Sequence, residues 1–407
     1  MSKVVEFGHD LWVAVQLKAP PSVQRTVISR LHDAKEIARL VIRPYLPVYQ
    51  LQGQGQGGPL TVTYVGLGFS RPFWKSFIFV EDPVEQQVGQ IPVWRYDKVA
   101  SLSWGDILFV EATKHLIRKL PQQGAIVLPE RVDHILDVQG DWQDVRNRFH
   151  KSVRKNELRL MRKYGYEYHV SCASQDFEEF YHQMYLPTTG DRHGELSFPK
   201  SVGEAYLFFR RGWLFRVERG GDWVSGVVCH PQGDVLLATT SGVKNGDAQL
   251  VHDGATAATY YAAIHWANQH GYKAVNFLGS GARLSGGLFQ HKRKWGSTVS
   301  VSPNLHRQIW IRVRQITPAV SQFLKENPLI TVDRDGELHG LIMVDDPSSV
   351  SAETRKEWEK SYATPGLSSL IVRSVSSLAQ EPADARDADL VIPIPSGSGF
   401  GNEPCES

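Results

Sequence analysis

The chain has 407 residues, of which 42% are hydrophobic and 22% charged, so it is long enough for two or three domains with their own cores. Lys and Arg number 45 against 43 Asp and Glu, a net charge of +2 that argues against a protein basic over its whole surface, as many nucleic-acid binders are. The three cysteines, Cys172, Cys229 and Cys405, form no CxxC pair, which argues against a cysteine zinc site or a disulfide framework.

The N-terminus carries Glu6, His9 and Asp10 where a signal peptide needs an unbroken apolar core. No run of 18 apolar residues occurs in the chain, so we expect no integral membrane span. The sequence therefore predicts a cytoplasmic protein, leaves a peripheral membrane contact open, and gives no sign of its oligomeric state.

The first 140 residues are predicted to form an α/β region. Residues 22–43 have the apolar spacing of an amphipathic helix that Pro44 ends. Residues 50–60, QLQGQGQGGPL, have the composition of a flexible loop. Short β-like segments follow at 60–69, 74–81 and 125–130.

Residues 141–163, DWQDVRNRFHKSVRKNELRLMRK, are predicted to form one helix. At about 100° per residue the apolar face carries Trp142, Val145, Phe149, Val153 and Leu160. The opposite face carries Arg148, Lys151, Lys155, Arg159 and Arg162. Leu158 and Met161 fit neither face, so we expect the helix to bend or change partners there. Five like charges on one stripe are normally a solvated face, although they also suit phosphate groups.

The central part of the chain alternates helices and strands. Residues 177–199 predict a helix, a stop at Pro187 and a polar TTGDRHG loop. Residues 213–243 predict three strands of an antiparallel meander separated by glycine turns. An Ala-rich helix over 249–270 ends at Gly271, and a strand follows.

From about residue 316 the character changes. A hairpin is predicted around Asp335-Gly336, followed by a short helix and a further strand. Residues 380–407 are rich in Pro, Gly, Ser and acidic residues and are predicted to be disordered. We therefore expect domains over 1–140 and 141–315, an extension over 316–379, and the tail.

Residues 275–297, VNFLGSGARLSGGLFQHKRKWGS, join a short strand, a glycine-rich turn and a basic segment. GSGARL starts like the dinucleotide motif GxGxxG but has Leu284 in sixth place and no early βαβ unit. GARLSGGL starts like a P-loop but has Gly287 and Leu288 where lysine and a hydroxyl residue are required. Nucleotide hydrolysis is therefore not indicated.

Other catalytic motifs are missing from the sequence. It holds no GxSxG elbow, no HExxH, and no short-spaced cluster of two histidines with a carboxylate. We predict neither a serine hydrolase nor a metal site, and we expect His252 and His265 of the Ala-rich helix to be packed or on the surface.

The order of elements over residues 141–300 resembles the GNAT acyltransferase fold, and more narrowly its Fem-type (FemABX) branch and the related BioF2-like and CelD-like acetyltransferase domains. The resemblance rests on RNRFHKSVRKNELRLMRKYGYE, YLPTTGDRHG, AATYYAAIHWANQHGYKAVNFLGSG and FQHKRKWGS. In that family a strand is followed by glycines, a Phe-Lys pair, two residues and an aromatic-Gly. Here His291, Lys292, Trp295 and Gly296 take those places, with His291 instead of Phe.

The resemblance implies an α/β (α+β) protein with a GNAT-like mixed sheet and flanking helices, in which residues 1–140 are a candidate degenerate first lobe. It also implies transfer of an acyl or aminoacyl group to an amine by direct attack in a ternary complex. The acceptor would be a small-molecule, glycan or peptide amine of the kind found in cell-envelope or polysaccharide synthesis.

The donor is left open by one departure from that family. The Q/RxxGxG/A turn that binds acetyl-CoA pyrophosphate in ordinary GNAT enzymes is missing before the Ala-rich helix, where the sequence reads GVKNGDAQLVHDGATA. The candidate donors are therefore acyl-CoA, an acyl carrier and aminoacyl-tRNA, each as a co-substrate and none as a tightly bound cofactor.

Lys292 is the candidate electrostatic catalyst, since a point charge stabilises an oxyanion or a phosphate. Asp191 is the candidate base, although such a residue is also common in turns. The candidate substrate-binding residues are Arg192, His193, Arg148, Lys151, Lys155, Arg159, Gly279, Gly281, Gly286, Gly287 and Trp295. Trp295 is more often a core residue than a ligand-stacking one, and Arg293 and Lys294 are expected to be surface charge.

Two other functions stay open from the sequence. One is a non-catalytic, degenerate GNAT-fold module in polysaccharide or cell-envelope synthesis, which the missing pyrophosphate turn favours. The other is an RNA-binding protein that uses the basic helix, which the small net charge disfavours.

Overall fold

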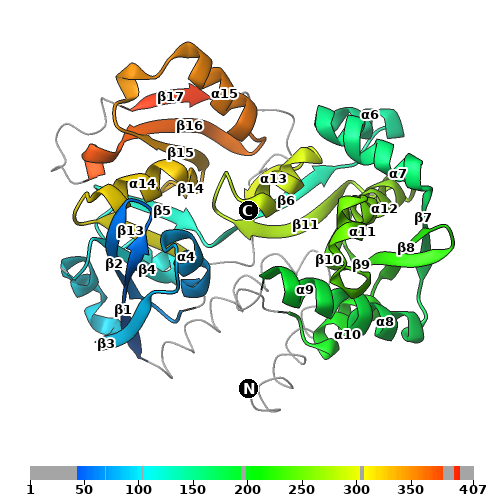
Figure 1. The fold of residues 1–407 in the computed structure, drawn as a ribbon, viewed down its shortest axis with the longest axis horizontal. Helices are drawn as coiled ribbons and strands as arrows, with labels where there is room; N and C mark the ends of the chain where they lie inside the picture. Colours follow the sequence, from blue (N-terminus) through cyan, green and yellow to red (C-terminus); the bar gives the residue numbers. More distant parts are fainter. Residues whose placement is uncertain are drawn as a thin grey trace, which may run out of the picture. The chain divides into compact units, whose positions relative to one another are not determined.

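The computed structural model describes residues 44–394 except positions 69, 103, 194–198, 303–306 and 379–388 (Figure 1). The helix predicted over 22–43 and most of the predicted tail lie outside the described residues. The described chain divides into two compact units. The central unit contains residues 133–278 and 291–298, and the flanking unit contains residues 44–132, 279–290 and 299–394. This division does not follow the contiguous ranges expected from the sequence.

The flanking unit contains a six-stranded sheet of order β3-β1-β2-β4-β13-β5. Its strands are β1 Tyr45–Gly55, β2 Gly58–Val65, β3 Val84–Pro92, β4 Ile107–Thr113, β5 Ala125–Pro129 and β13 Arg307–Val313. β2 pairs with β4 in parallel, and the other neighbours are antiparallel. The sheet is therefore mixed.

Two predictions in this unit are wrong. Residues 50–60 are not a loop but a hairpin, in which Leu51 pairs with Val62 and the turn uses Gly57 and Gly58 at positive φ. Buried Leu51 and Leu60 hold the glutamine-rich strand in the sheet. Residues 74–81 are mostly helical rather than β, since α4 spans Arg71–Ile78. Trp74 and Ile78, one helical turn apart, bury the same face of α4.

A four-stranded sheet of order β14-β15-β16-β17 completes the flanking unit. Its strands are β14 Leu329–Val332, β15 Leu338–Val344, β16 Leu367–Ser374 and β17 Leu390–Pro393. The predicted Asp335-Gly336 hairpin is confirmed. β17 corrects the predicted disordered tail, because Ile392 is buried and the strand pairs with β16. Besides α4, the α-helices of this unit include α5 Lys114–Ile117, α14 Pro318–Glu326 and α15 Ala352–Tyr362.

A seven-stranded sheet of order β12-β6-β11-β10-β9-β8-β7 forms most of the central unit. Its strands are β6 Arg131–Asp137, β7 Tyr166–Ser171, β8 Trp213–Arg219, β9 Asp222–Gln232, β10 Val235–Val243, β11 Ala274–Gly281 and β12 Thr298–Val301. The predicted meander of β8, β9 and β10 is confirmed.

Helices flank this sheet (Figure 1). They are α6 Trp142–Arg148, α7 Leu158–Tyr164, α8 Ser174–Phe180, α9 Leu186–His193, α10 Val202–Arg210, α11 Ala248–His252, α12 Ala255–Gln269 and α13 Gly287–Lys294. The Ala-rich helix divides into α11 and α12 at Gly254, which has φ of 102°. Its buried alanines, among them Ala258 and Ala262, let the helix backbone approach the sheet closely.

The single helix predicted over 141–163 is broken. α6 ends at Arg148, and the next residue, Phe149, is extended with ψ of 140°. The N–H of His150 donates to the carbonyl of Lys294 at 2.8 Å. The chain then resumes as a π-helix over Val153–Glu157 and continues as α7. A wheel that assumes one uninterrupted α-helix therefore places every residue after Phe149 at the wrong angle.

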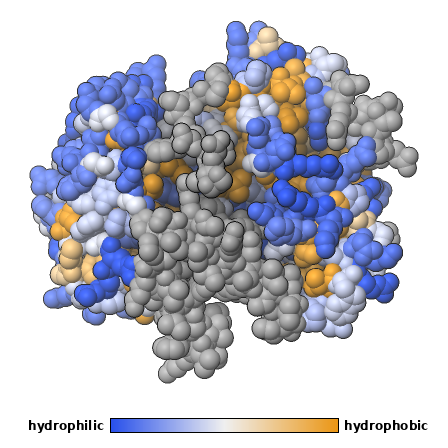
Figure 2. All heavy atoms as spheres, turned by 180° about the vertical axis from the view of Figure 1, so that it is seen from behind, coloured by the Kyte–Doolittle hydropathy of each residue, from blue (hydrophilic) through white to orange (hydrophobic). Residues whose placement is uncertain are grey.

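The face shown in Figure 2, opposite to that of Figure 1, carries hydrophilic residues over most of its coloured area and hydrophobic residues in smaller patches. Exposed large hydrophobic residues in the described chain include Trp94 and Val84 of the flanking unit. Single exposed apolar residues of this kind are ordinary on a globular surface.

Because His230 on β9 is buried, we expect the stability of the fold to decrease in acid. Its ring stacks on Phe208 at 4.9 Å between ring centroids, and burial, the main cause, lowers its pKa from 6.5 to about 4. The unfolded chain then binds a proton that the folded chain rejects, so stability falls as pH drops from 6.5 towards 4. The full effect is about 3 kcal/mol in the free energy of unfolding. Urea titrations between pH 6.5 and 4 should show that His230→Phe loses less free energy of unfolding than the wild type does. An equal loss in both proteins would contradict the role given to His230.

Candidate functional site

The candidate site lies where β10 and β11 diverge. The parallel pairing of these strands covers three residue pairs, from Val235–Ala274 to Leu237–Asn276. Just beyond, the register of β10 with β9 shifts between Ala238 and Thr240, while β11 runs on to Gly281. Where two parallel strands separate, their backbone N–H and C=O groups no longer form hydrogen bonds with each other.

Leu278 on β11 has a strained backbone at this opening. Its φ is 60°, and among the described residues only Asn245 is another non-glycine with positive φ. Such a conformation costs on the order of 1–2 kcal/mol for a residue with a Cβ. Two hydrogen bonds hold it: the N–H of Leu278 donates to Asn276 Oδ1 at 2.7 Å, and Lys292 Nζ donates to the Leu278 carbonyl at 3.0 Å. Strain held in this way is concentrated at functional sites.

Lys292 on α13 is buried, with 4% of the residue exposed. The structure thus brings the predicted catalytic lysine onto the strand that precedes the glycine-rich turn. An ammonium group this far from water must be balanced by polar partners, and it acts on its surroundings more strongly than a surface charge does. Lys292 is therefore not the solvated turn lysine that the sequence also allowed.

His134 on β6 belongs to the same buried group, although the sequence did not single it out. Burial, and then the positive charge of Lys292, lower the pKa of His134 well below its usual value. Nδ1 of His134 lies 3.0 Å from Ser297 Oγ, and that hydroxyl donates to the carbonyl of Lys292 at 3.1 Å. Since the hydroxyl proton is used in this way, Nδ1 of the neutral ring carries the proton and Nε2 is the basic nitrogen.

The tautomer of His134 gives a testable difference between two substitutions. In His134→Asn the amide nitrogen takes the place of Nδ1, whereas in His134→Gln it takes the place of Nε2. We expect the Asn variant to be more stable than the Gln variant by about 1 kcal/mol, because only Asn keeps the hydrogen bond to Ser297. Urea unfolding at pH 7.5 measures this, and a more stable Gln variant would reverse the assigned tautomer.

Asp133, next to His134, is a buried carboxylate with 6% of the residue exposed. Asn276 Nδ2 lies 3.5 Å from its Oδ2, and the same Asn276 side chain holds Leu278. The signal in the sequence was the pair of polar residues inside the apolar run of β6, which is unusual for a buried strand.

Trp295 and His291 pack with the aromatic core of the central unit. Trp295 is 1% exposed, stacks on Tyr260 at 5.6 Å and meets Phe149 edge-on at 5.2 Å. His291 meets Tyr260 at 4.9 Å, so its ring takes an aromatic position as Phe does in the family motif. Packing therefore accounts for Trp295 without a ligand.

The predicted substrate-binding glycines belong to the flanking unit. A Cβ on Gly281 would come within 2.5 Å of the Phe73 ring, whereas Gly287 has no atom within 4 Å of that position. Gly286 would place a Cβ 3.1 Å from the Arg283 carbonyl. Gly281 thus has a packing reason to be glycine, and the donor contact proposed for Gly279 and these three residues stays a prediction.

Residues 191–193 do not lie in a loop. Pro187 does not stop the preceding helix, because α9 spans Leu186–His193 after a π-helix over Tyr181–Tyr185. Pro187 falls in the first turn of α9, where a missing N–H is best tolerated. The backbones of Asp191, Arg192 and His193 are helical, while their side chains lie outside what the structure describes, so their roles stay predictions.

The basic residues of 148–159 separate into two kinds. Arg148 Nη1 donates to the carbonyls of Asp137 and Gln139, each at 2.9 Å, and Nη2 lies 3.4 Å from the Asp137 carboxylate. It therefore fixes α6 to the end of β6. Lys151, Lys155 and Arg159 are exposed and form no ion pair with any described residue, so phosphate contact stays a prediction for these three.

The flanking unit has a buried polar group of its own around Glu111 on β4. Glu111 is 2% exposed and accepts hydrogen bonds from the Tyr64 hydroxyl and, at 3.1 Å, from the N–H of Ser70. Arg307 lies 3.4 Å away. Burial, the largest cause, raises the pKa of Glu111, and the charge of Arg307 opposes that rise. This cluster was also missed, and its signal is an acid inside the apolar run ILFVEAT.

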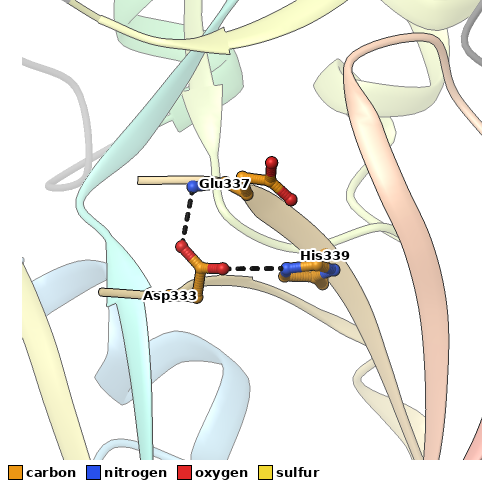
Figure 3. Close-up of side chains that lie close together, drawn as sticks. All are labelled: Asp333, Glu337 and His339. Atoms are coloured by element: carbon orange, nitrogen blue, oxygen red, sulfur yellow. Dashed lines mark hydrogen bonds and ion pairs between the residues drawn. The ribbon is translucent and has the colours of Figure 1, made fainter. Parts of the chain in front are cut away.

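Asp333, Glu337 and His339 place potential metal-ligand atoms within 4.8 Å of one another (Figure 3). Asp333 Oδ1 accepts from the N–H groups of Asp335 and Glu337 at 2.9 and 2.8 Å, and its Oδ2 lies 3.5 Å from His339 Nε2. These bonds close the β14–β15 turn, so the hairpin itself explains the grouping and we assign it no metal.

No helix in the described ranges is both long and apolar enough to cross a bilayer. No family model matches the sequence, and no curated protein matches it. Solved structures that resemble the chain include FemX, with 11% identity, TM-score 0.36 and coverage of 70% of this chain and 92% of FemX. Another is L-PGS from Bacillus licheniformis, with 12% identity, TM-score 0.33 and coverage of 67% and 87%.

A third is an acetyltransferase of the GNAT family from Novosphingobium aromaticivorans, with 11% identity, TM-score 0.27 and coverage of 56% and 84%. FemX and the Novosphingobium protein bear the names of two groups that the sequence resembles. All three TM-scores lie below 0.5. The chain itself is an α/β protein with mixed sheets.

Proposed function

We propose that the protein transfers an acyl or aminoacyl group from a thioester or tRNA donor to an amine. The amine nitrogen attacks the carbonyl carbon, a C–N bond forms, and the C–S bond of a thioester or the C–O bond of an aminoacyl ester breaks. The amine loses a proton and the leaving sulfur or oxygen gains one, so no covalent enzyme intermediate is needed. This agrees with the absence of a hydrolase elbow from the sequence.

The observation that carries the proposal is the buried Lys292 ammonium at the opening between β10 and β11. Attack on a carbonyl develops negative charge on its oxygen, and a preorganised cation in a low-dielectric site is the usual means of stabilising that charge. Lys292 would supply it, with the His134 ring kept neutral beside it. Asp191 remains the proposed base, and Arg192 and His193 the proposed substrate contacts.

The non-catalytic module remains the second candidate, because a buried lysine that donates to a backbone carbonyl also serves as a structural clamp on Leu278. Binding of donors separates the two. Melting curves of the purified protein with acetyl-CoA, longer acyl-CoAs, charged acyl carrier protein and aminoacyl-tRNA test it directly, since a ligand that binds only the folded state raises the melting temperature.

If one donor class raises the melting temperature of the wild type, and raises that of Lys292→Met less, the result supports the transferase and identifies its donor. An unchanged melting temperature with every donor would favour the non-catalytic module. A rise with uncharged and aminoacyl-tRNA alike, abolished by moderate salt and by removal of Lys151 and Lys155, would instead favour RNA binding.

A further inference from the structure

The central unit contains a cavity of about 320 Å³ that the proposed transfer site does not use. It lies among α6, α7, the start of β7 and α12, whereas Lys292 and His134 do not line it. Ligand sites are commonly cavities of roughly this size with mostly apolar walls and a few polar groups. The side chains around the cavity indicate what it would hold.

One wall exists because of the π-helix. Leu158 donates its N–H to the carbonyl five residues earlier, Val153, so the helix gains one residue in this turn. An extra residue turns everything after it by about 100° relative to an uninterrupted helix. This rotation explains why Leu158 and Met161 fit neither face of the predicted helix. Both are 7–8% exposed and line the cavity. Such π-turns are frequent at functional sites.

A second wall is aromatic. Trp142 and Tyr261 line the cavity with their rings perpendicular at 5.4 Å, and Tyr166 lines it from β7. Tyr261 also stacks on His265 at 5.3 Å, and the Tyr168 hydroxyl lies 2.8 Å from Nδ1 of that histidine. The rings are therefore fixed by their neighbours and present a rigid apolar surface to an occupant.

Two guanidinium groups, those of Arg146 and Arg162, lie at the cavity. Nη1 of Arg146 donates to Gln143 at 3.4 Å and Nε of Arg162 donates to the Leu158 carbonyl at 3.3 Å, but neither arginine pairs with a carboxylate of the described chain. One carboxylate, Glu167, also lines the cavity, so its charged lining is +1 in total. An arginine without an acidic partner, beside a cavity whose walls include aliphatic and aromatic side chains, suits an anionic group on an apolar body.

We propose that this cavity binds a small molecule with an apolar body and a single anionic head group, its body between Leu158, Met161 and Trp142 and its head at Arg146 and Arg162. A carboxylate and a monoanionic phosphate ester share this chemistry. The site goes beyond the proposed transfer reaction, because it is built from other residues and needs no donor.

The probe is 1-anilinonaphthalene-8-sulfonate, which has an aromatic body and one sulfonate and fluoresces when bound in an apolar site. We expect saturable binding to the folded wild-type protein at low salt. Arg162→Ala should weaken binding about tenfold, since one charge-assisted hydrogen bond is lost. Met161→Trp should abolish binding by filling the cavity. Arg154→Ala, at an exposed position of the adjoining π-helix that does not line the cavity, is the matched control and should bind the probe as wild type does.

Melting temperature and near-ultraviolet circular dichroism test whether each variant is folded. If Arg162→Ala does not fold, Arg146→Ala provides the second test of the head-group contact. Competition then identifies the head group: decanoate and dibutyl phosphate, each with one negative charge, should displace the probe, whereas decylamine should not. Displacement by decylamine as effective as by decanoate, or binding that Met161→Trp and both arginine variants leave unchanged, would overturn the proposal. Lys292→Met should bind the probe normally, so failure of this site and failure of the transfer function are separable.

Discussion

Replacing Lys292 by Met is expected to lower the rate of acyl transfer to an amine by about 100- to 1,000-fold, the range found when one preorganised oxyanion donor is removed. Met has a similar length and fills the buried space, so the loss reflects the missing charge. The transfer rate with saturating donor is the quantity to measure, because an interaction made mainly in the transition state lowers kcat more than it raises KM.

Lys294→Met is the matched control for this experiment. Lys294 lies on the same helix and is half-buried, but its side chain forms no hydrogen bond or ion pair with a described residue of β11, so the rate should stay near that of the wild type. A Lys292→Met protein that unfolds more easily yet transfers at the wild-type rate would show that Lys292 only clamps the strained Leu278 carbonyl.

Gly296→Ala is expected to destabilise the protein by at least about 4 kcal/mol, because two severe effects combine. The φ of Gly296 is 80°, and a Cβ there would lie 2.2 Å from the carbonyl oxygen of Arg148. That carbonyl cannot move aside easily, since the Arg148 side chain is hydrogen-bonded to the carbonyls of Asp137 and Gln139. Chemical denaturation of the purified variant measures the loss.

Gly287→Ala is the control, since its Cβ would meet no atom within 4 Å and its φ is not positive. Ala is also the better helix former, so this variant should be as stable as the wild type or slightly more stable. Equal stability of the two variants would show that the glycine of the aromatic-Gly pair is not required for the fold.

The sequence predicted the repetitive elements well where one pattern dominated. The β8–β10 meander, the end of the Ala-rich helix before Gly271 (φ of 74°) and the Asp335-Gly336 hairpin formed as expected, although the Ala-rich helix is divided at Gly254. Their signals are local: alternation, helical periodicity, and glycines where positive φ is needed. The sequence also singled out Lys292, because it sits in a short motif of fixed spacing; the structure shows it buried, and its catalytic role stays a prediction.

Predictions failed where a contact distant in sequence decided the outcome. The break at Phe149 depends on the Lys294 carbonyl and the Trp295 ring, which are about 145 residues away along the chain. The hairpin over 50–60 depends on burial of Leu51 and Leu60, which outweighs a loop-like composition. Local propensity cannot report such contacts.

Only part of the candidate site could be predicted from the sequence, for the same reason. His134, Asp133 and Asn276 lie on two strands that become neighbours only in the folded sheet, so no spacing along the chain joins them. Their one local signal is polarity inside a buried strand, which Glu111 also shows. Polar residues among apolar neighbours within a strand are thus the local feature that the two buried clusters share.

The most direct measurement is transfer itself. Wild-type protein, with each of the labelled donors acetyl-CoA, acyl carrier protein thioester and aminoacyl-tRNA, is incubated with a panel of small-molecule, glycan and peptide amines, and the label on the amine is followed by mass spectrometry. We predict that one donor class yields an amide product whose formation depends on Lys292. Absence of any amide product from every donor, with the protein folded and the donors intact, would contradict the transferase function.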